Sequence, residues 1–396
     1  MITNNIFSFL KTLCYAIFGL LILINHTFAD EFADNFQFNG FFTLDATITD
    51  QDLALISNSD NTVAYDANSL SFKNSLIGAQ LSYSFTDNFT AVMQAKLYDK
   101  SKVSSSDETS LAQIDWAYIS YDLGADLKAR AGRFLVPFMQ GTELRSVGFS
   151  RLWARPLIPN SGAGGYKEFI GVELLKHFAM GEGNWDFQLS LGQGEHDLER
   201  IKNKHIEVFS IRYQQDSFWI RSAVLSTQYD IYTQTNNLIK DSATALMFST
   251  ELEYTLQNFV FNGGYTQSKT DITPDNRNIY LSLAYNFDPF IPYVFHARSN
   301  QHFDLFDLPV LNPPNNGIDP QNPSSSMPLP PPPPMSLERP EGDLDIYHWA
   351  LGVRYNFSER YALKFQLEHI NEDNKANFKT EKGEGNALTI VLEGIF

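Results

Sequence analysis

The stretch KARAGRFLVPFMQGTELRSVGFSRLWARPLIPNSGAGGYK, residues 128–167, decides the fold. It begins with the alternation of a β-strand, passes through a middle rich in Arg and aromatics, and ends in Gly and Pro. A compact domain seldom keeps so long a connection unless the connection has a use. We predict that this stretch folds into the lumen of a transmembrane antiparallel β-barrel as its third outer loop, and that the rest of the chain forms the barrel.

The segments on both sides of this stretch have the pattern of strands. Residues 36–48 alternate apolar and polar side chains with a period of two, which is typical of a strand with one apolar face. Short turns alternate with longer polar connections, and seven short and eight long connections predict about sixteen strands. The short turns lie at 86–88, 122–126, 179–184, 214–217, 256–258, 287–289 and 358–360, and the long connections lie around 49–69, 99–110, 135–167, 193–204, 228–241, 268–277, 300–345 and 371–385.

Aromatic residues make up 14% of the chain and gather on both sides of the short turns. Strands favour aromatics in any case, which explains their number but not their position. We therefore predict an aromatic girdle at one membrane interface. The last segment, residues 386–396, alternates again and ends in Phe396, which is similar to the terminal signal read by outer-membrane insertion machinery. We predict that Leu392 and Phe396 serve assembly by the barrel-assembly machinery.

The beginning of the chain has the pattern of a signal peptide. A positive charge precedes an apolar core at 13–24, which is too short for a membrane helix. The residues Thr27-Phe28-Ala29 follow it and suit a signal peptidase. We predict a signal peptide at 1–29 and an outer-membrane barrel at 30–396, with a long Pro-rich outer loop at 300–345 that is extended polyproline in part.

Composition and motifs exclude several kinds of function. The formal charge of −17 argues against a nucleic-acid partner, which needs a basic face. The single cysteine, Cys14, would be removed with the signal peptide, so the mature chain has no thiol chemistry. None of HExxH, GxSxG, CxxC or GxxxxGK[ST] occurs, and the Asp-rich loops lack the spacing of an EF-hand. We predict no enzyme activity, no catalytic residue, no metal and no cofactor.

The candidate site is the pore constriction. If Leu127, Ala129 and Ala131 face lipid, Lys128 and Arg130 face the lumen. This register is energetically constrained, because an Arg facing lipid near the midplane costs about 2–4 kcal/mol. We predict a constriction lined by Lys128, Arg130, Arg133, Glu143, Arg145, Arg151, Arg155 and Lys167.

Two interpretations of these basic side chains stay open. They can form a positive ring in the constriction, or they can pin the loop to acidic residues of the wall. Alternation also places charges of both signs in the lumen, which argues against strong anion selectivity. The basic candidates are Arg212, Arg221, Arg354 and Lys364, and the acidic candidates are Asp45, Glu173, Glu251, Glu253 and Glu368.

Three stretches resemble a known family. RAGRFLVPF at 130–138, RSVGFSRLWARP at 145–156 and ALGVRYNFSERYALKFQLEHI at 350–370 are similar to the phosphate-selective porin O and P family and its porin-like relatives. The resemblance implies sixteen strands, a homotrimer, and diffusion of small solutes through an eyelet narrowed by the third loop. Members that prefer phosphate use a ladder of pore Arg with added Lys. Only Arg130, Arg133, Arg145, Arg151 and Arg155 match that pattern, and no Lys cluster is evident, so phosphate is not implied as the substrate.

We expect a passive porin of the bacterial outer membrane that lets small hydrophilic solutes or ions diffuse, with weak anion preference. Its partners would be outer-membrane lipid and lipopolysaccharide, further copies of itself in a homotrimer, and the small solutes. An outer-membrane barrel enzyme is one alternative, and it requires a nucleophile, a His and an acid that converge at the rim. An adhesin or structural barrel is another, with the polyproline loop as its contact surface.

Overall fold

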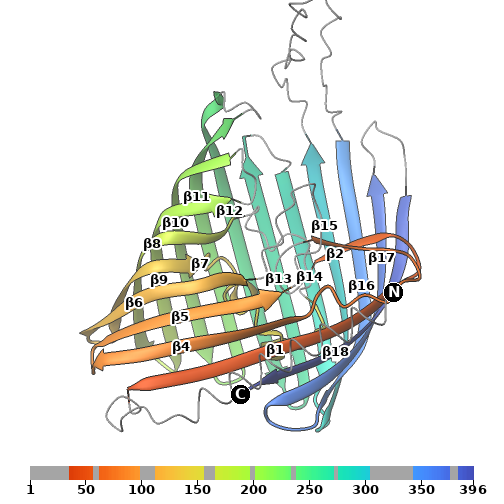
Figure 1. The fold of residues 1–396 in the computed structure, drawn as a ribbon, viewed down its shortest axis with the longest axis horizontal. Coiled ribbons are helices and arrows are strands. Elements are labelled where there is room, and N and C mark those ends of the chain that lie inside the picture. Colours follow the sequence, from red (N-terminus) through yellow and green to blue (C-terminus); the bar gives the residue numbers. More distant parts are fainter. Residues whose placement is uncertain are drawn as a thin grey trace, which may run out of the picture.

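The computed structural model describes residues 35–56, 62–98, 112–155, 166–196, 201–232, 238–271, 275–303, 342–374 and 382–396. The predicted signal peptide and most of the predicted Pro-rich loop lie outside these residues, and both stay predictions. Within them, sixteen strands form one closed antiparallel barrel (Figure 1), so the predicted fold class is confirmed. The barrel strands are β1 (Phe36–Thr49), β4 (Leu76–Thr86), β5 (Phe89–Tyr98), β6 (Ala112–Gly124), β7 (Leu127–Leu135), β8 (Tyr166–Met180), β9 (Gly183–His196), β10 (Ile201–Gln215), β11 (Phe218–Tyr232), β12 (Leu238–Leu256), β13 (Phe259–Thr270), β14 (Asp275–Tyr285), β15 (Phe290–Phe303), β16 (Gly342–Asn356), β17 (Tyr361–Asn374) and β18 (Lys382–Ile395).

Each barrel strand presents an apolar face outward and a mixed face inward. In β14, Ile279, Leu281 and Leu283 are exposed, whereas Tyr280 and Ser282 between them are buried. Successive side chains of a strand point to opposite faces, so the exposed apolar row lies on the outside of the barrel. Such a surface suits the hydrocarbon of a membrane. No helix among the described residues is both long and apolar enough to cross a membrane.

The predicted short turns all join neighbouring strands and gather at one end of the barrel, which we call the short-turn end (Figure 1). Ring pairs lie beside them. Phe290 stacks on Tyr355 with 4.8 Å between centroids, and Phe259 meets Tyr285 edge-on at 4.8 Å. The opposite end, from which the long connections start, is called the long-loop end.

The barrel closes between its first and last strands. Phe396 donates its backbone N–H to the carbonyl of Gly40 at 2.9 Å, and Gly40 donates to the carbonyl of Phe396 at 2.6 Å. A Cβ on Gly40 would lie 2.2 Å from the Phe396 ring, so the seam requires glycine there. Leu392 lies in the same seam, opposite Leu44. Both residues predicted to serve assembly therefore lie where the barrel closes, and their recognition by assembly machinery stays a prediction.

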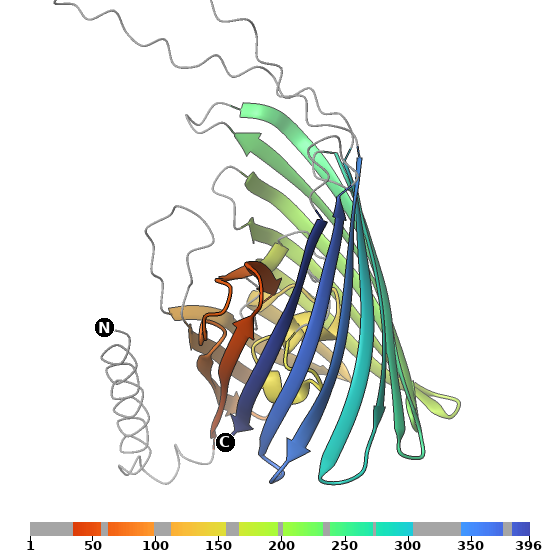
Figure 2. The ribbon, with the colours of Figure 1, turned by 90° about the vertical axis from the view of Figure 1, so that its right-hand side faces the viewer.

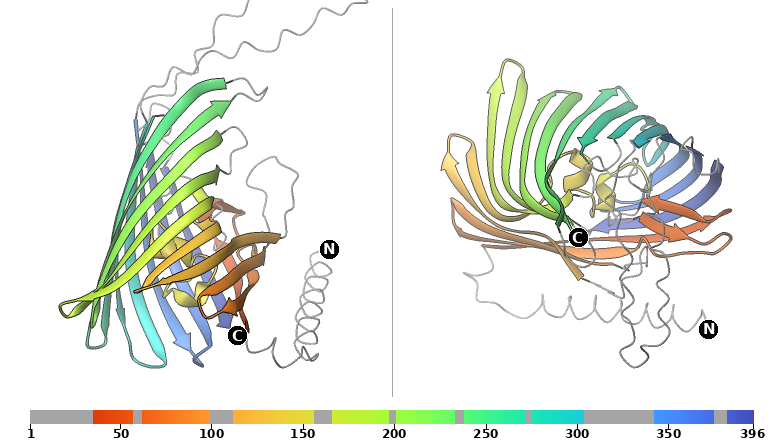
Figure 3. Two further views of the ribbon diagram at one scale, coloured as in Figure 1. Left: turned by 90° about the vertical axis from the view of Figure 1, so that its left-hand side faces the viewer. Right: turned by 90° about the horizontal axis from the view of Figure 1, so that it is seen from above.

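Two connections fold back onto the inner wall. After β7 the third loop enters the lumen (Figure 3, right) through the short helix α3 (Gln140–Glu143) and the 3₁₀ turn η1 (Gly148–Ser150), which contacts β1 and β18. The first long connection, expected to be a polar loop, contains a hairpin of β2 (Leu53–Ile56) and β3 (Thr62–Tyr65). Tyr65 of that hairpin packs with the inward-facing Ile370 and Ala387, which explains why the segment is ordered.

Candidate functional site

The first part of the third loop is attached to the inner wall by apolar packing. Val136, Phe138 and Met139 are buried, and they belong to one cluster with Leu225 of β11 and Met247 of β12. The loop main chain is also bonded to this wall, because Ser249 donates its hydroxyl to the carbonyl of Phe138 at 2.5 Å. This half of the lumen wall is therefore largely dry where it meets the loop.

One wall arginine holds the helical turn of the loop. The guanidinium of Arg221 in β11 pairs with Glu143 at 2.6 Å and donates to the carbonyl of Pro137 at 2.9 Å. Glu143 itself remains partly exposed, at 28% of its side chain. Glu143 is therefore ion-paired with Arg221 and still in contact with solvent.

A single carboxylate joins the loop to the strands that flank it. Glu168 of β8 pairs with Arg145 at 3.5 Å and with Arg133, and it accepts a hydrogen bond from Gln113. Arg145 is buried, with 2% of its side chain exposed. Arg133 is opposite Ile170, an exposed outward residue, so its Cβ lies on the outward face and its guanidinium bends toward Glu168.

A second buried group anchors the loop to β5 and β6. The ammonium of Lys96 pairs with Asp115 at 3.1 Å and donates to the hydroxyl of Ser146 at 2.9 Å. Ser146 in turn donates to Asp115 at 2.7 Å. The three side chains close a triangle in which the buried charge of Lys96 is matched by that of Asp115.

The middle of the loop is held by cations of the opposite wall that bind its carbonyls. Lys364 of β17 donates to the carbonyls of Gly148 and Trp153, at 3.0 Å each, and pairs with Glu393 of β18. A Cβ on Gly148 would lie 2.0 Å from the Glu393 carboxylate, so only glycine fits this approach. Arg354 of β16 donates to the carbonyls of Phe149 and Arg151, at 2.9 and 2.8 Å.

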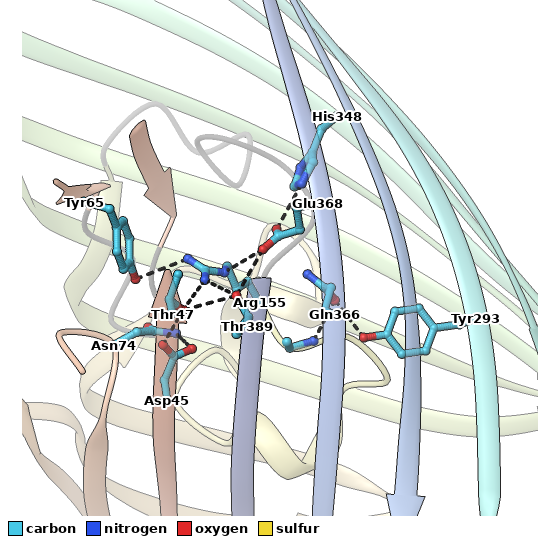
Figure 4. A network of polar contacts seen from close by, with 11 residues as sticks. Asp45, Thr47, Tyr65, Asn74, Arg155, Tyr293, His348, Gln366, Glu368 and Thr389 are labelled. Atoms are coloured by element: carbon cyan, nitrogen blue, oxygen red, sulfur yellow. Dashed lines mark hydrogen bonds and ion pairs between the residues drawn. The ribbon is translucent and has the colours of Figure 1, made fainter. Parts of the chain in front are cut away.

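The end of the described loop is fixed by Arg155, which lies in a network between β1, β17 and β18 (Figure 4). Its guanidinium pairs with Glu368 at 3.1 Å and donates to Thr47 at 2.6 Å and to Thr389. It also donates to the phenol of Tyr65 at 3.2 Å, so the first loop and the third loop meet here. Burial acts to lower the pKa of Arg155, but Glu368, Tyr65 and Asp45 together outweigh burial and raise the pKa, so the side chain stays charged.

The predicted constriction residues therefore differ in burial and in position, and they do not form one ring. Arg145, Arg151 and Arg155 are buried against wall groups. Arg130 is 25% exposed, lies 3.6 Å from Glu173, and stacks over the ring of Tyr118. Lys128 is exposed near the short-turn end, and Lys167 lies in β8 with a side chain outside the described part of the structure.

Sequence reasoning identified part of the wall that holds the loop. Alternation correctly placed Arg221, Arg354, Lys364 and Glu368 inside the barrel, although it gave no indication that they contact the loop. Lys96, Asp115, Glu393 and Tyr65 were missed. Among the described residues, no group of His, Cys, Asp and Glu is arranged to hold a metal ion.

Comparison with known proteins defines the fold but no closer relationship. The chain superposes on the anion-selective porin from Comamonas acidovorans with a TM-score of 0.53 at 12% identity, covering 91% of this chain and 99% of that one. For the outer membrane channel DcaP of Acinetobacter baumannii the TM-score is 0.55 at 10% identity, with 91% and 97% covered. For the trimer form of OmpT from Vibrio cholerae it is 0.50 at 9% identity, with 91% and 99% covered.

No protein-family model matches the chain, and no curated protein matches its sequence. At these identities the structural likeness establishes the fold, which is the sixteen-stranded fold of porin-like outer-membrane barrels. It does not single out the phosphate-selective group among barrels of this kind.

Proposed function

We propose that the protein is a porin of the bacterial outer membrane through which small hydrophilic solutes diffuse passively. The observation that carries this proposal is the third loop, which is held inside a closed barrel by contacts to the walls on both sides. A loop fixed in this way sets the width of the lumen without any chemical step. The solved structures with the same fold include an anion-selective porin and an outer membrane channel, which supports the proposal.

We further propose that the predicted constriction arginines have two roles. Some fix the loop to the wall, and we call these pins; others face the solute path, and we call these lining. A buried guanidinium whose charge is matched by a carboxylate contributes little field to a solute path, so Arg145 and Arg155 serve as pins. Arg130 faces the lumen, keeps 25% of its side chain exposed and supplies the weak anion preference, whereas Arg133 starts from the outward face and is bound by Glu168. This arrangement differs from a continuous ladder of pore Arg and Lys, so we propose no specificity for phosphate.

Like the trimer form of OmpT from Vibrio cholerae, the barrel would assemble as a homotrimer in this proposal. The short turns would face the periplasm and the long loops would face outward.

Planar-bilayer recording tests the function. The purified protein should give step conductances, with a reversal potential that indicates weak anion preference in a salt gradient. The variant Arg130→Ala should move the reversal potential toward cation preference with little change in conductance. The double variant Arg145→Ala/Arg155→Ala should instead raise the conductance and its fluctuations, because the loop is released.

Arg360→Ala, in an exposed short turn, provides the control for loss of one positive charge. A wild-type protein that inserts but conducts nothing would overturn the porin and favour the structural barrel. Equal effects of Arg130→Ala and of Arg145→Ala/Arg155→Ala on reversal potential and conductance would refute the division into pins and lining.

A further inference from the structure

The outward surface of β12 to β16 contains an apolar groove. The ribbons of these strands lie toward the right of Figure 2. The groove has a volume of about 540 Å³, which is in the range of small-ligand sites. Its floor is Gly263, whose missing side chain leaves a depression between larger neighbours. A Cβ there would lie 3.2 Å from the end of Leu281, so any side chain would begin to fill it. The groove is walled by Leu252, Phe261, Leu281, Val294 and Trp349.

Basic side chains stand above this groove on three neighbouring strands. Arg298 is opposite Ile279, and Arg277 is opposite Asn300, so the two arginines are diagonal neighbours on the outward face. Lys269 follows on β13. Arg298 is paired with Asp345 at 2.8 Å, whereas Arg277 and Lys269 are exposed and have no acidic partner among the described residues. In a chain with a formal charge of −17, two cations without an ion pair on neighbouring strands stand out, although Asp275 also lies on this face, two residues before Arg277.

The height of these cations matches a membrane interface. Arg277 lies eight residues before Tyr285, which is at the short-turn end of the same strand. At about 3.3 Å per residue and a tilt of about 40°, that separation is about 20 Å along the membrane normal. The apolar band of such barrels is about 25 Å tall, so Arg277 starts about 5 Å below its upper edge and its long side chain extends toward the interface, while the groove lies deeper in the band.

The side chains between the groove and the cations change gradually from apolar to polar. The ring of His296 stacks on Trp349 with 4.0 Å between centroids, at the upper end of the groove. The guanidinium of Arg298 then lies over the ring of Tyr347 at 5.2 Å. Apolar, aromatic and basic side chains in this order match the acyl chain, the ester region and the headgroup of a lipid.

We propose that this face is a binding site for a phosphorylated lipid of the outer leaflet. One acyl chain occupies the groove around Gly263, and the phosphate groups are bound by Arg277 and Lys269. The site rests on the outer-membrane location proposed above and on the long loops facing outward. It is separate from the constriction, because the side chains that wall the groove, Leu252, Phe261, Leu281, Val294 and Trp349, lie on the outward face.

Native mass spectrometry of the detergent-solubilised protein tests the site. The protein is titrated with diphosphorylated lipid A, with phosphatidylcholine as a lipid without net charge, and with inorganic phosphate as a headgroup without chains. We expect one lipid A per protomer, bound at least tenfold more tightly than phosphatidylcholine, and no displacement by equimolar phosphate. The double variant Lys269→Gln/Arg277→Gln should weaken lipid A binding at least tenfold, and Gly263→Leu should do the same by filling the groove.

Arg360→Gln removes a charge at the short-turn end and should leave binding unchanged. Equal affinity for both lipids, or a double variant that binds like the wild type, overturns the proposal. Displacement by phosphate would show that the cations bind a free anion, which also overturns the proposal. A Gly263→Leu variant that changes only the oligomeric state would show that the groove binds a second copy of the protein, and this overturns the proposal as well. Conductance recorded from the same samples separates the two proposals. Lipid binding without conductance refutes only the channel function, and conductance without lipid binding refutes only this lipid site.

Discussion

The third loop is attached to the two halves of the lumen wall by different physical means. Toward β16, β17 and β18 it is held by buried cations and carboxylates, with Lys364 and Arg354 bound to its carbonyls and Arg155 bound to Glu368. Toward β10, β11 and β12 it is held mainly by apolar side chains, with Phe138 and Met139 in the buried cluster, while Arg221 and Ser249 add polar contacts to Glu143 and to two loop carbonyls. Hydrogen bonds are directional and fix the position of the main chain, whereas apolar burial is not directional and fixes volume.

This difference indicates what each side contributes. The charged side determines where the loop lies to within a hydrogen-bond length, but a missing partner there leaves an uncompensated charge. The apolar side tolerates small shifts and contributes stability in proportion to the area it covers. We therefore expect changes on the charged side to be the more damaging ones, and the following variants test that ranking.

The largest effect should come from Lys364→Ala. It leaves the Glu393 carboxylate buried without its cation and removes the donor from two loop carbonyls. We expect a loss of about 3–5 kcal/mol in the free energy of unfolding, measured by urea titration of the folded barrel in detergent. Lys364→Ala/Glu393→Ala, which removes both charges, should recover much of the loss. A double variant as unstable as the single one would show that the charge pair is not the cause.

An intermediate effect should come from Met139→Ala on the apolar side. Met139 is buried at the edge of the cluster, so we expect a loss of about 2–3 kcal/mol, toward the lower end for such truncations. Met139→Leu should be nearly neutral in the same urea titration, because it conserves volume. If Met139→Ala costs more than Lys364→Ala, the ranking of the two sides is reversed and the loop is held mainly by packing.

The smallest effect should come from Tyr65→Phe. It removes one acceptor of Arg155, while Glu368, Thr47 and Thr389 remain. We expect a loss of about 0.5–1.5 kcal/mol in stability, with the single-channel conductance essentially unchanged. Tyr65→Ala also removes the ring from its cluster with Ile370 and Ala387 and should cost more, which separates the hydrogen bond from the packing. A conductance that changes with Tyr65→Phe would show that the first loop also controls the constriction.

Much of the barrel could be predicted because a period of two defines which face a side chain occupies. The inward position of Arg130 and Lys364 follows from that period, and the short turns and the number of barrel strands follow from the alternation of short and long connections. Asp115 shows where it fails. Counted from the turn after β6, Asp115 falls on the outward face, but a register shift opposite Gln94 and Ala95 reverses it and brings it to Lys96.

The candidate site was predictable only in part, because alternation gives a face and not a height along the strand. Which loop carbonyl meets Lys364 depends on the path of the loop, and that path depends on contacts such as the glycine at 148 against Glu393. Arg155 could be recognised as a pore residue. Its partner Tyr65 could not, because it comes from a hairpin inside a connection that has the composition of a polar loop.

The contacts of Arg155 also link the position of the third loop to the closure of the barrel. Its guanidinium bonds Thr47 near the start of the barrel and Thr389 near its end, and these two hydroxyls lie 3.1 Å apart across the closing seam. The anchor for the loop is therefore incomplete until the last strand has paired with the first, after most of the chain has been placed. The anchor at Arg155 therefore depends on closure of the barrel, whereas the packing of Phe138 and Met139 against β11 and β12 does not.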